Sequence, residues 1–296
     1  DTLSVDLGIK FNNNTSLDVL IADQSYTMGY HSYRETPAEE QQFRTDQDSI
    51  TFDTKLNFGE DSDSLFGHAG IAYFEREQDI VSTGATVYEG EDESDSQAIY
   101  GELNYALTDT WLLTGGLRYQ EEEQKRDFNY PLSSILIDLD LEEDIFLPSI
   151  ALQYDVTENT RLGFSARQGY NSAGGSAHPV FGTYFFYDKE EVNAFELSAR
   201  SSFADDTILL RANLFFNDYD GYQATDRVLG ITNVDAETLG AEIEATAMIS
   251  TDFEVRLNLG LLESEITDGR ALSSITGNEL PIAPELPPVQ VHLFCY

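Results

Sequence analysis

The chain has 296 residues with 54 acidic and 16 basic side chains, which gives a formal net charge of −38. Binding to a nucleic-acid backbone needs a basic surface, so a nucleic-acid partner is excluded. The single cysteine, Cys295, excludes a disulfide framework and a cysteine-based zinc site, and no apolar run is long enough for a transmembrane helix.

From Leu3 onward, apolar and polar side chains alternate with the period of a β-strand that has two unlike faces. Short polar turns interrupt the pattern roughly every 45 to 50 residues, at residues 12–16, 59–64, 108–110, 157–160, 204–207 and 250–252. Between them lie polar segments that we expect to be long loops, at residues 32–48, 79–96, 121–144, 170–190, 222–231 and 263–285. Short turns that alternate with long loops are typical of an outer-membrane barrel.

The clearest repeat unit is a hairpin over residues 187–223 with a tight turn at residues 204–207. Leu197 on one arm and Leu214 on the other lie on its apolar face. A soluble sheet would cover such a face with another layer, whereas a membrane barrel turns it towards lipid. Because the hairpin recurs along the chain, we predict an all-β protein, an antiparallel up-and-down transmembrane β-barrel that is partial, with about 12–13 strands.

The opposite face of nearly every strand carries charges of both signs, which a water-filled lumen accepts more readily than a packed core. We predict that the following side chains face a lumen: Asp6, Lys10, Asp53, Lys55, Glu102, Arg118, Arg161, Arg167, Glu196, Arg200, Arg211, Glu242, Glu244, Glu254 and Arg256. Aromatic residues beside the short turns indicate an interfacial girdle, at Phe11, Phe58, Tyr105, Trp111, Tyr154, Phe203 and Phe253. A general preference of aromatic residues for strands would explain them as well.

Several motifs, taken in order, resemble the barrel portion of TonB-dependent outer-membrane receptors. One strand reads Glu-Val-Asn-Ala-Phe-Glu-Leu-Ser-Ala-Arg over residues 191–200, with Ser198 where the family usually has glycine. The next reads Asn-Leu-Phe-Phe-Asn-Asp-Tyr over residues 213–219. Further similar segments are residues 115–119, 169–175, 231–234, 240–244 and 280–284. The resemblance is strongest over residues 145–284.

The resemblance implies a bacterial outer-membrane location and a barrel of about 22 strands around an N-terminal plug domain. We therefore expect residues 1–296 to form a single domain, a barrel fragment truncated at both ends and without the plug. The implied partners are membrane lipid, the TonB system and the plug. The candidates for plug-facing lumen residues are Arg118, Glu196, Arg200, Glu242 and Arg256.

The segment at residues 170–187 is the strongest candidate for contact with a small-molecule ligand, because it combines glycines with many aromatic rings. The candidate ligand-binding residues are Arg167, Tyr170, His178, Tyr184 and Tyr187. The same rings would also suit an outer girdle, or a loop that packs on itself.

Catalytic and metal-binding motifs are not found. The sequence has no phosphate loop, no His-Glu-x-x-His and no nucleophile elbow, so we expect neither an enzyme nor a bound cofactor. No pair of histidines has ligand spacing, so no metal ligands are predicted. The acidic runs at residues 60–64 and 91–95 offer oxygen ligands to Ca²⁺, but neither has the spacing of a calcium loop, which favours solvated runs of charge.

The leading hypothesis is a transport receptor that takes up a scarce nutrient, with a ferric siderophore as the first candidate, through plug movement driven by TonB. That mechanism follows from the resemblance. A plugless outer-membrane diffusion channel is the first alternative, since a charged lumen suits it as well. The second is a soluble all-β adhesin or carbohydrate-binding module, in which Leu257 and Leu259 would face a second sheet.

Overall fold

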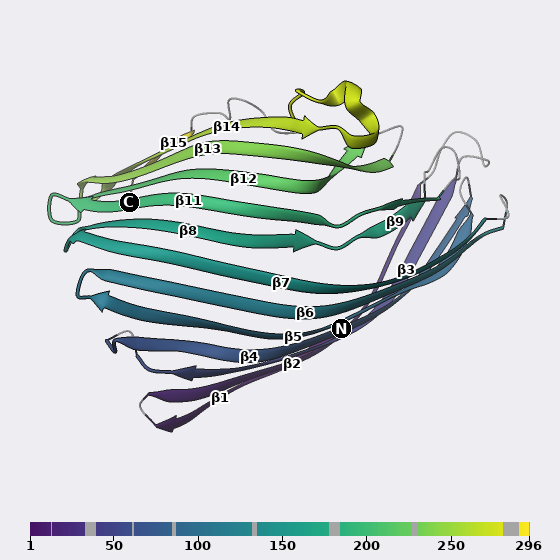
Figure 1. Cartoon of the computed structure of the whole chain (residues 1–296), viewed down its shortest axis with the longest axis horizontal. Helices are drawn as coiled ribbons and strands as arrows, with labels where there is room; N and C mark the ends of the chain where they lie inside the picture. Colours follow the sequence, from purple (N-terminus) through teal and green to yellow (C-terminus); the bar gives the residue numbers. More distant parts are fainter. Residues whose placement is uncertain are drawn as a thin grey trace.

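The computed structural model describes residues 1–12, 14–32, 40–60, 62–84, 87–131, 135–177, 184–226, 230–280 and 290–295. Within them, thirteen antiparallel strands form one sheet in the order β1-β2-β3-β4-β5-β6-β7-β8-β11-β12-β13-β14-β15. The sheet curves into a trough (Figure 1), and the predicted partial barrel of about 12–13 strands is confirmed. No helix among the described residues is long and apolar enough to cross a membrane.

The strands are long, and neighbours in sequence are neighbours in space except across the short pair β9–β10. Their bounds are β1 Thr2–Asn12, β2 Thr15–Ser32, β3 Gln41–Phe58, β4 Leu65–Gly84, β5 Tyr88–Thr108, β6 Trp111–Tyr130, β7 Ile135–Thr157, β8 Thr160–Asn171, β9 Gly174–Ala177, β10 Tyr184–Tyr187, β11 Glu190–Phe203, β12 Ile208–Asp226, β13 Gly230–Ser250, β14 Phe253–Asp268 and β15 Gln290–Cys295. A 3-10 helix, η2, spans Arg270–Ile275.

One face of the sheet is apolar and uncovered. Leu197 and Leu214, opposite each other in β11 and β12, are both 55% exposed, and Ile99 on β5 is 61% exposed. A water-soluble sheet would bury such side chains, so this outer face fits contact with lipid. The second layer that a soluble sandwich requires is not present among the described residues, in which the other sheet is the β9–β10 pair.

The six predicted short turns are confirmed, and all lie at one end of the trough, on the left of Figure 1. Trp111 and Tyr154, two of the predicted girdle residues, stack at that end with ring centroids 4.3 Å apart. Further along β6, the outer face changes from apolar to acidic at Tyr119, whose hydroxyl donates to Glu121 at 3.0 Å and to Asp144 at 2.9 Å. The apolar band therefore ends at the level of Tyr119.

The expectation that the longer polar segments are loops is wrong for most of their length. Residues 79–96 continue β4 and β5, and residues 121–144 continue β6 and β7 in unbroken register. The acidic run at residues 91–95 accordingly lies within β5. Beyond the apolar band both faces of the sheet meet water, so the alternation of apolar side chains disappears while the backbone ladder continues.

The turn between β11 and β12 holds three consecutive non-glycine residues in the left-handed region, with φ of 53° at Ala204, 55° at Asp205 and 64° at Asp206. Each costs roughly 1–2 kcal/mol relative to a right-handed conformation. We predict that Ala204→Gly raises the free energy of unfolding by up to about 1 kcal/mol, measured by urea denaturation followed by circular dichroism. The matched change Ala212→Gly, inside β12, should lower it by about 0.5–1 kcal/mol, and a loss at both positions would contradict the expectation.

Candidate functional site

The inner face of the sheet carries the polar side chains, and bonds that skip a strand identify it. Tyr100 on β5 donates from its hydroxyl to both carboxylate oxygens of Asp53 on β3, each at 2.9 Å. The Arg118 guanidinium on β6 lies 5.7 Å from the centre of the Tyr100 ring. Three strands thus share one charged surface inside the trough.

Register places the predicted plug-facing residues on this same face. Glu196 lies opposite Ser165 and Phe215, Arg200 lies opposite Arg161 and Arg211, and Glu242 lies opposite Asn213 and Gly260. Arg256 forms an ion pair with Glu254 in its own strand. That a plug covers these side chains stays a prediction.

At the end away from the short turns, residues 170–175 fold across the inner face, and we call them the strap. Tyr170 and Ser172 each donate a hydroxyl hydrogen to a different carboxylate oxygen of Glu122 on β6. Arg126, further along β6, donates to the carbonyl of Gly175 at 2.6 Å. From the other side, the Gln223 amide on β12 donates to the carbonyl of Ser172 at 2.8 Å. The strap is therefore fixed to two separate strands of the wall.

The surroundings of the strap are acidic and partly dehydrated. Burial raises the pKa of Glu143 above its usual value; Lys189 opposes this, and the charges of Glu122 and Glu191 add to it. One carboxylate oxygen of Glu143 is buried without a hydrogen-bond partner. Burial and the bond to Glu122 likewise raise the pKa of Tyr170. Both groups therefore keep their neutral forms to a higher pH than usual.

Two arginines converge on one carboxylate above the membrane band. Asp92 on β5, only 5% exposed, accepts from Arg76 on β4 at 2.8 Å and pairs with Arg126 on β6 at 2.6 Å. A small cluster of Phe128, Tyr130 and Ile137 is buried at the same end. The inner face of β4–β7 is thus closely packed here rather than open to solvent.

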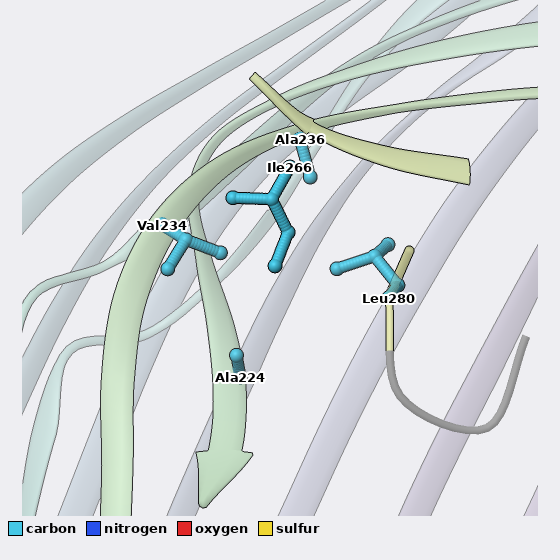
Figure 2. Close-up of a cluster of buried hydrophobic side chains, with 5 residues drawn as sticks. All are labelled: Ala224, Val234, Ala236, Ile266 and Leu280. Carbon is cyan, nitrogen blue, oxygen red and sulfur yellow. The ribbon is translucent and has the colours of Figure 1, made fainter. Parts of the chain in front are cut away.

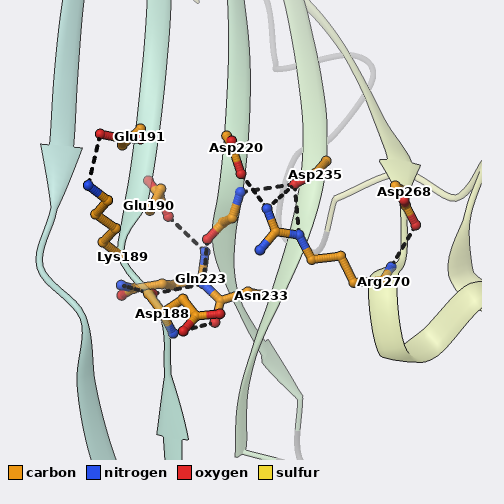
Figure 3. Close-up of polar contacts among 11 residues, drawn as sticks. Asp188, Lys189, Glu190, Glu191, Asp220, Gln223, Asn233, Asp235, Asp268 and Arg270 are labelled. Carbon is orange, nitrogen blue, oxygen red and sulfur yellow. Dashed lines mark hydrogen bonds and ion pairs between the residues drawn. The ribbon is translucent and has the colours of Figure 1, made fainter.

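A second network ties the far ends of β11–β14 together (Figure 3). Gly221, with φ of 73°, marks a bulge in β12, and Asn233 donates to its carbonyl at 2.6 Å and to that of Asp188 at 2.8 Å. Arg270 at the start of η2 donates to Asp235 at 2.9 Å and pairs with Asp220. These bonds position the segment that follows β14.

Beneath this network lies the larger buried apolar cluster, formed by Ala224, Val234, Ala236, Ile266 and Leu280. Figure 2 shows Leu280 pointing towards Ile266. The chain at Asn278 pairs with Ile266 through a backbone hydrogen bond of 2.8 Å, and this brings Leu280 to the cluster. Tyr219 and Tyr222 pack against it, so this part of the inner face is apolar and aromatic.

The candidate ligand residues have different outcomes. Arg167 lies on the inner face, opposite Ser149 and Ala194, and Tyr170 is the first residue of the strap. Tyr187 pairs with Gly174 and Tyr184 with Ala177 in the β9–β10 hairpin. His178 lies outside the described residues. Tyr170 thus begins the strap and Tyr187 pairs with Gly174 of the strap, and whether they bind a ligand stays a prediction.

The sequence did not single out Glu122, Arg76, Arg126 or Arg270, and it marked Asp92 only as part of the acidic run at residues 91–95. All except Arg76 fall in segments that we expected to be loops. The alternation of side chains along a strand could have identified the residues on β6. Arg118, Gln120, Glu122 and Arg126 are separated by even numbers of residues and therefore share one face of the strand. Within the described residues, no group of three or more His, Cys, Asp or Glu side chains could hold a metal ion, so the calcium alternative gains no support there.

The chain is similar to known proteins over most of its length. The family described as TonB dependent receptor-like, beta-barrel matches residues 1–289. The curated "Pesticin receptor" of Yersinia pestis is 26% identical over 213 residues, which cover 69% of this chain and 30% of that protein.

Solved structures share the fold at low identity. The ferric yersiniabactin uptake receptor FyuA from Yersinia pestis gives a TM-score of 0.77 at 18% identity, over 96% of this chain and 44% of that one. The copper transporter OprC gives 0.77 at 12% identity, over 99% of this chain and 50% of that one. The chain thus spans 30% of the curated relative and about half of the similar structures.

Proposed function

This chain belongs to the TonB dependent receptor-like β-barrel family, and from that premise we propose that it forms the wall of a receptor for TonB-energised uptake of a scarce nutrient. The chain is part of an outer-membrane β-barrel, and its uncovered apolar face would be the surface that contacts lipid. The observation that carries the proposal is the inner face, where a charged wall leads from the short turns up to a strap folded inward. A plain diffusion channel could use the same wall, and the family match over residues 1–289 favours the receptor.

The first candidate ligand is a ferric siderophore. It is supported by the names of the relatives, which include a pesticin receptor and a ferric yersiniabactin uptake receptor. The ligand would lie over the strap, with Arg167, Tyr170 and Tyr187 as contacts, and Tyr184 and His178 are further candidates from the sequence. The lower wall, with Arg118, Glu196, Arg200, Glu242 and Arg256, would face a plug. The relatives are named as receptors and transporters, and the proposal assigns this chain no catalytic step.

Uptake of radiolabelled ferric siderophores tests the proposal in cells that lack the gene, with the gene restored and with TonB removed as the control. Uptake should return with the gene and should be lost again without TonB. A parallel assay with labelled copper separates iron complexes from other metal cargo. Entry of small sugars that is independent of TonB would instead support a diffusion channel and would overturn the receptor proposal.

A further inference from the structure

One row of side chains crosses the inner face close to the short turns. Register places Asp155, Arg161, Arg200, Arg211 and Glu244 directly opposite one another on β7, β8, β11, β12 and β13. Carboxylates lie at the two ends and three guanidinium groups lie between them. Like charges directly opposite each other in a sheet are destabilising, so this arrangement needs a compensating partner.

The two outer arginines have partners within the sheet. Arg161 donates to Asp155 at 2.6 and 3.1 Å, and Arg211 lies 3.6 Å from Glu244. Arg200, between them, has no ion pair or hydrogen bond among the residues that the structure describes. In a chain with 54 acidic and 16 basic residues, an arginine left without a carboxylate between two other arginines stands out.

The space above Arg200 is shaped to admit a side chain. A hollow of about 490 Å³ is lined by the three arginines, by Glu242 and Glu244, and by the small or polar residues Gln153, Gly163, Ser165, Ser198 and Asn213. Gly163 and Ser198 face each other so closely that a Cβ on the glycine would lie 2.5 Å from the serine hydroxyl. Because these side chains are short, they leave space beside the arginines, and a group can approach the guanidinium groups from inside the lumen.

From this geometry we propose that Arg200, with Arg161 and Arg211 beside it, binds a carboxylate side chain of the polypeptide that fills the lumen. The inference rests on the proposed function, because that function requires a plug. Guanidinium groups match a carboxylate in shape and charge, and the bonds between them are among the strongest hydrogen bonds in proteins. Arg200 lies four residues before the turn at residues 204–207. The short turns of outer-membrane barrels face the periplasm, so an acidic plug residue would be held near the periplasmic opening.

The test is the urea concentration at which the full protein, in a planar lipid bilayer, begins to conduct as the plug is released. Arg200→Ala and Arg200→Glu should conduct at lower urea than wild type, and the effect of Arg200→Ala should shrink in 1 M salt, where charges are screened beyond about 3 Å. Arg200→Lys keeps the positive charge but loses the forked guanidinium group, so its urea threshold should fall between those of wild type and Arg200→Ala. Lys55→Ala, which removes an inner-face base whose partner is Asp18, is the matched control and should behave as wild type.

Citrate supplies a free carboxylate and gives a second readout. It should compete with the plug carboxylate and lower the urea threshold of wild type, with an apparent affinity about ten-fold weaker in Arg200→Ala. If wild type is closed without urea and Arg200→Ala matches it at low salt, the carboxylate site is wrong while the receptor proposal stands. If wild type conducts fully without urea, no plug fills the lumen, and both proposals fail.

Discussion

Replacing Asp92 with alanine should destabilise the barrel by about 3 kcal/mol, because two arginines lose the carboxylate that they share. Asp92 is 5% exposed, and its partners Arg76 and Arg126 have side chains only 27% and 16% exposed. Water therefore has little access to the two guanidinium groups and cannot compensate for the lost carboxylate. The measurement is urea denaturation of the protein in lipid vesicles, followed by the circular dichroism of the sheet.

The matched control is Asp46→Ala, which removes the partner of Arg44. That pair has the same chemistry, with a distance of 2.7 Å, but its side chains are 65% and 40% exposed. Solvent screens such a pair, so the unfolding midpoint of this variant should stay close to that of wild type. Equal losses from the two variants would mean that burial of Asp92 does not set its contribution.

Replacing Leu214 with arginine should lower the stability of the inserted barrel by about 2–4 kcal/mol, the cost of a cation on a lipid-facing position near the midplane. Leu214 is 55% exposed on the outer face, between Leu197 and Ala241 on the neighbouring strands. The same denaturation assay in vesicles measures the loss.

The neighbouring position gives a strict comparison. Asn213→Arg introduces the same side chain one residue earlier, on the inner face, where Asn213 lies opposite Ser198 and Glu242. Water can hydrate the new guanidinium group and the Glu242 carboxylate can pair with it, so the change in stability should stay within about 0.5 kcal/mol. If Asn213→Arg were the more damaging variant, the assignment of inner and outer faces would be reversed.

The sequence predicts the part of the sheet next to the short turns well, because the alternation of apolar and polar side chains there has one physical cause. Between the short turns and Tyr119, one face meets lipid and the other meets water, so every second residue reports the face it occupies. Strand number, turn positions and the β11–β12 hairpin follow from that alternation. Above Tyr119 both faces are polar, and the pattern no longer separates a strand from a loop.

The site is less accessible to sequence reasoning, because long-range pairing builds it. Ser172 contacts Glu122 and Gln223, which are 50 and 51 residues away, and no local signal links those positions. Charges such as Arg118 and Glu196 could be assigned to the inner face from the alternation of side chains along their strands alone. The contacts of Tyr170 and the shared carboxylate of Asp92 depend on how the strap and the upper strands fold inward.

The order of the strands also bears on how the molecule is assembled. Apart from the junction at β8 and β11, each strand between β1 and β15 in the main sheet pairs with the strand before it and the strand after it in sequence. Chain segments therefore meet partners that are close by, and the loop entropy spent on each new pairing is small. A growing edge can accept one hairpin at a time, much as repeat proteins extend unit by unit. A defect in one strand then delays the strands that follow it and leaves those already paired intact.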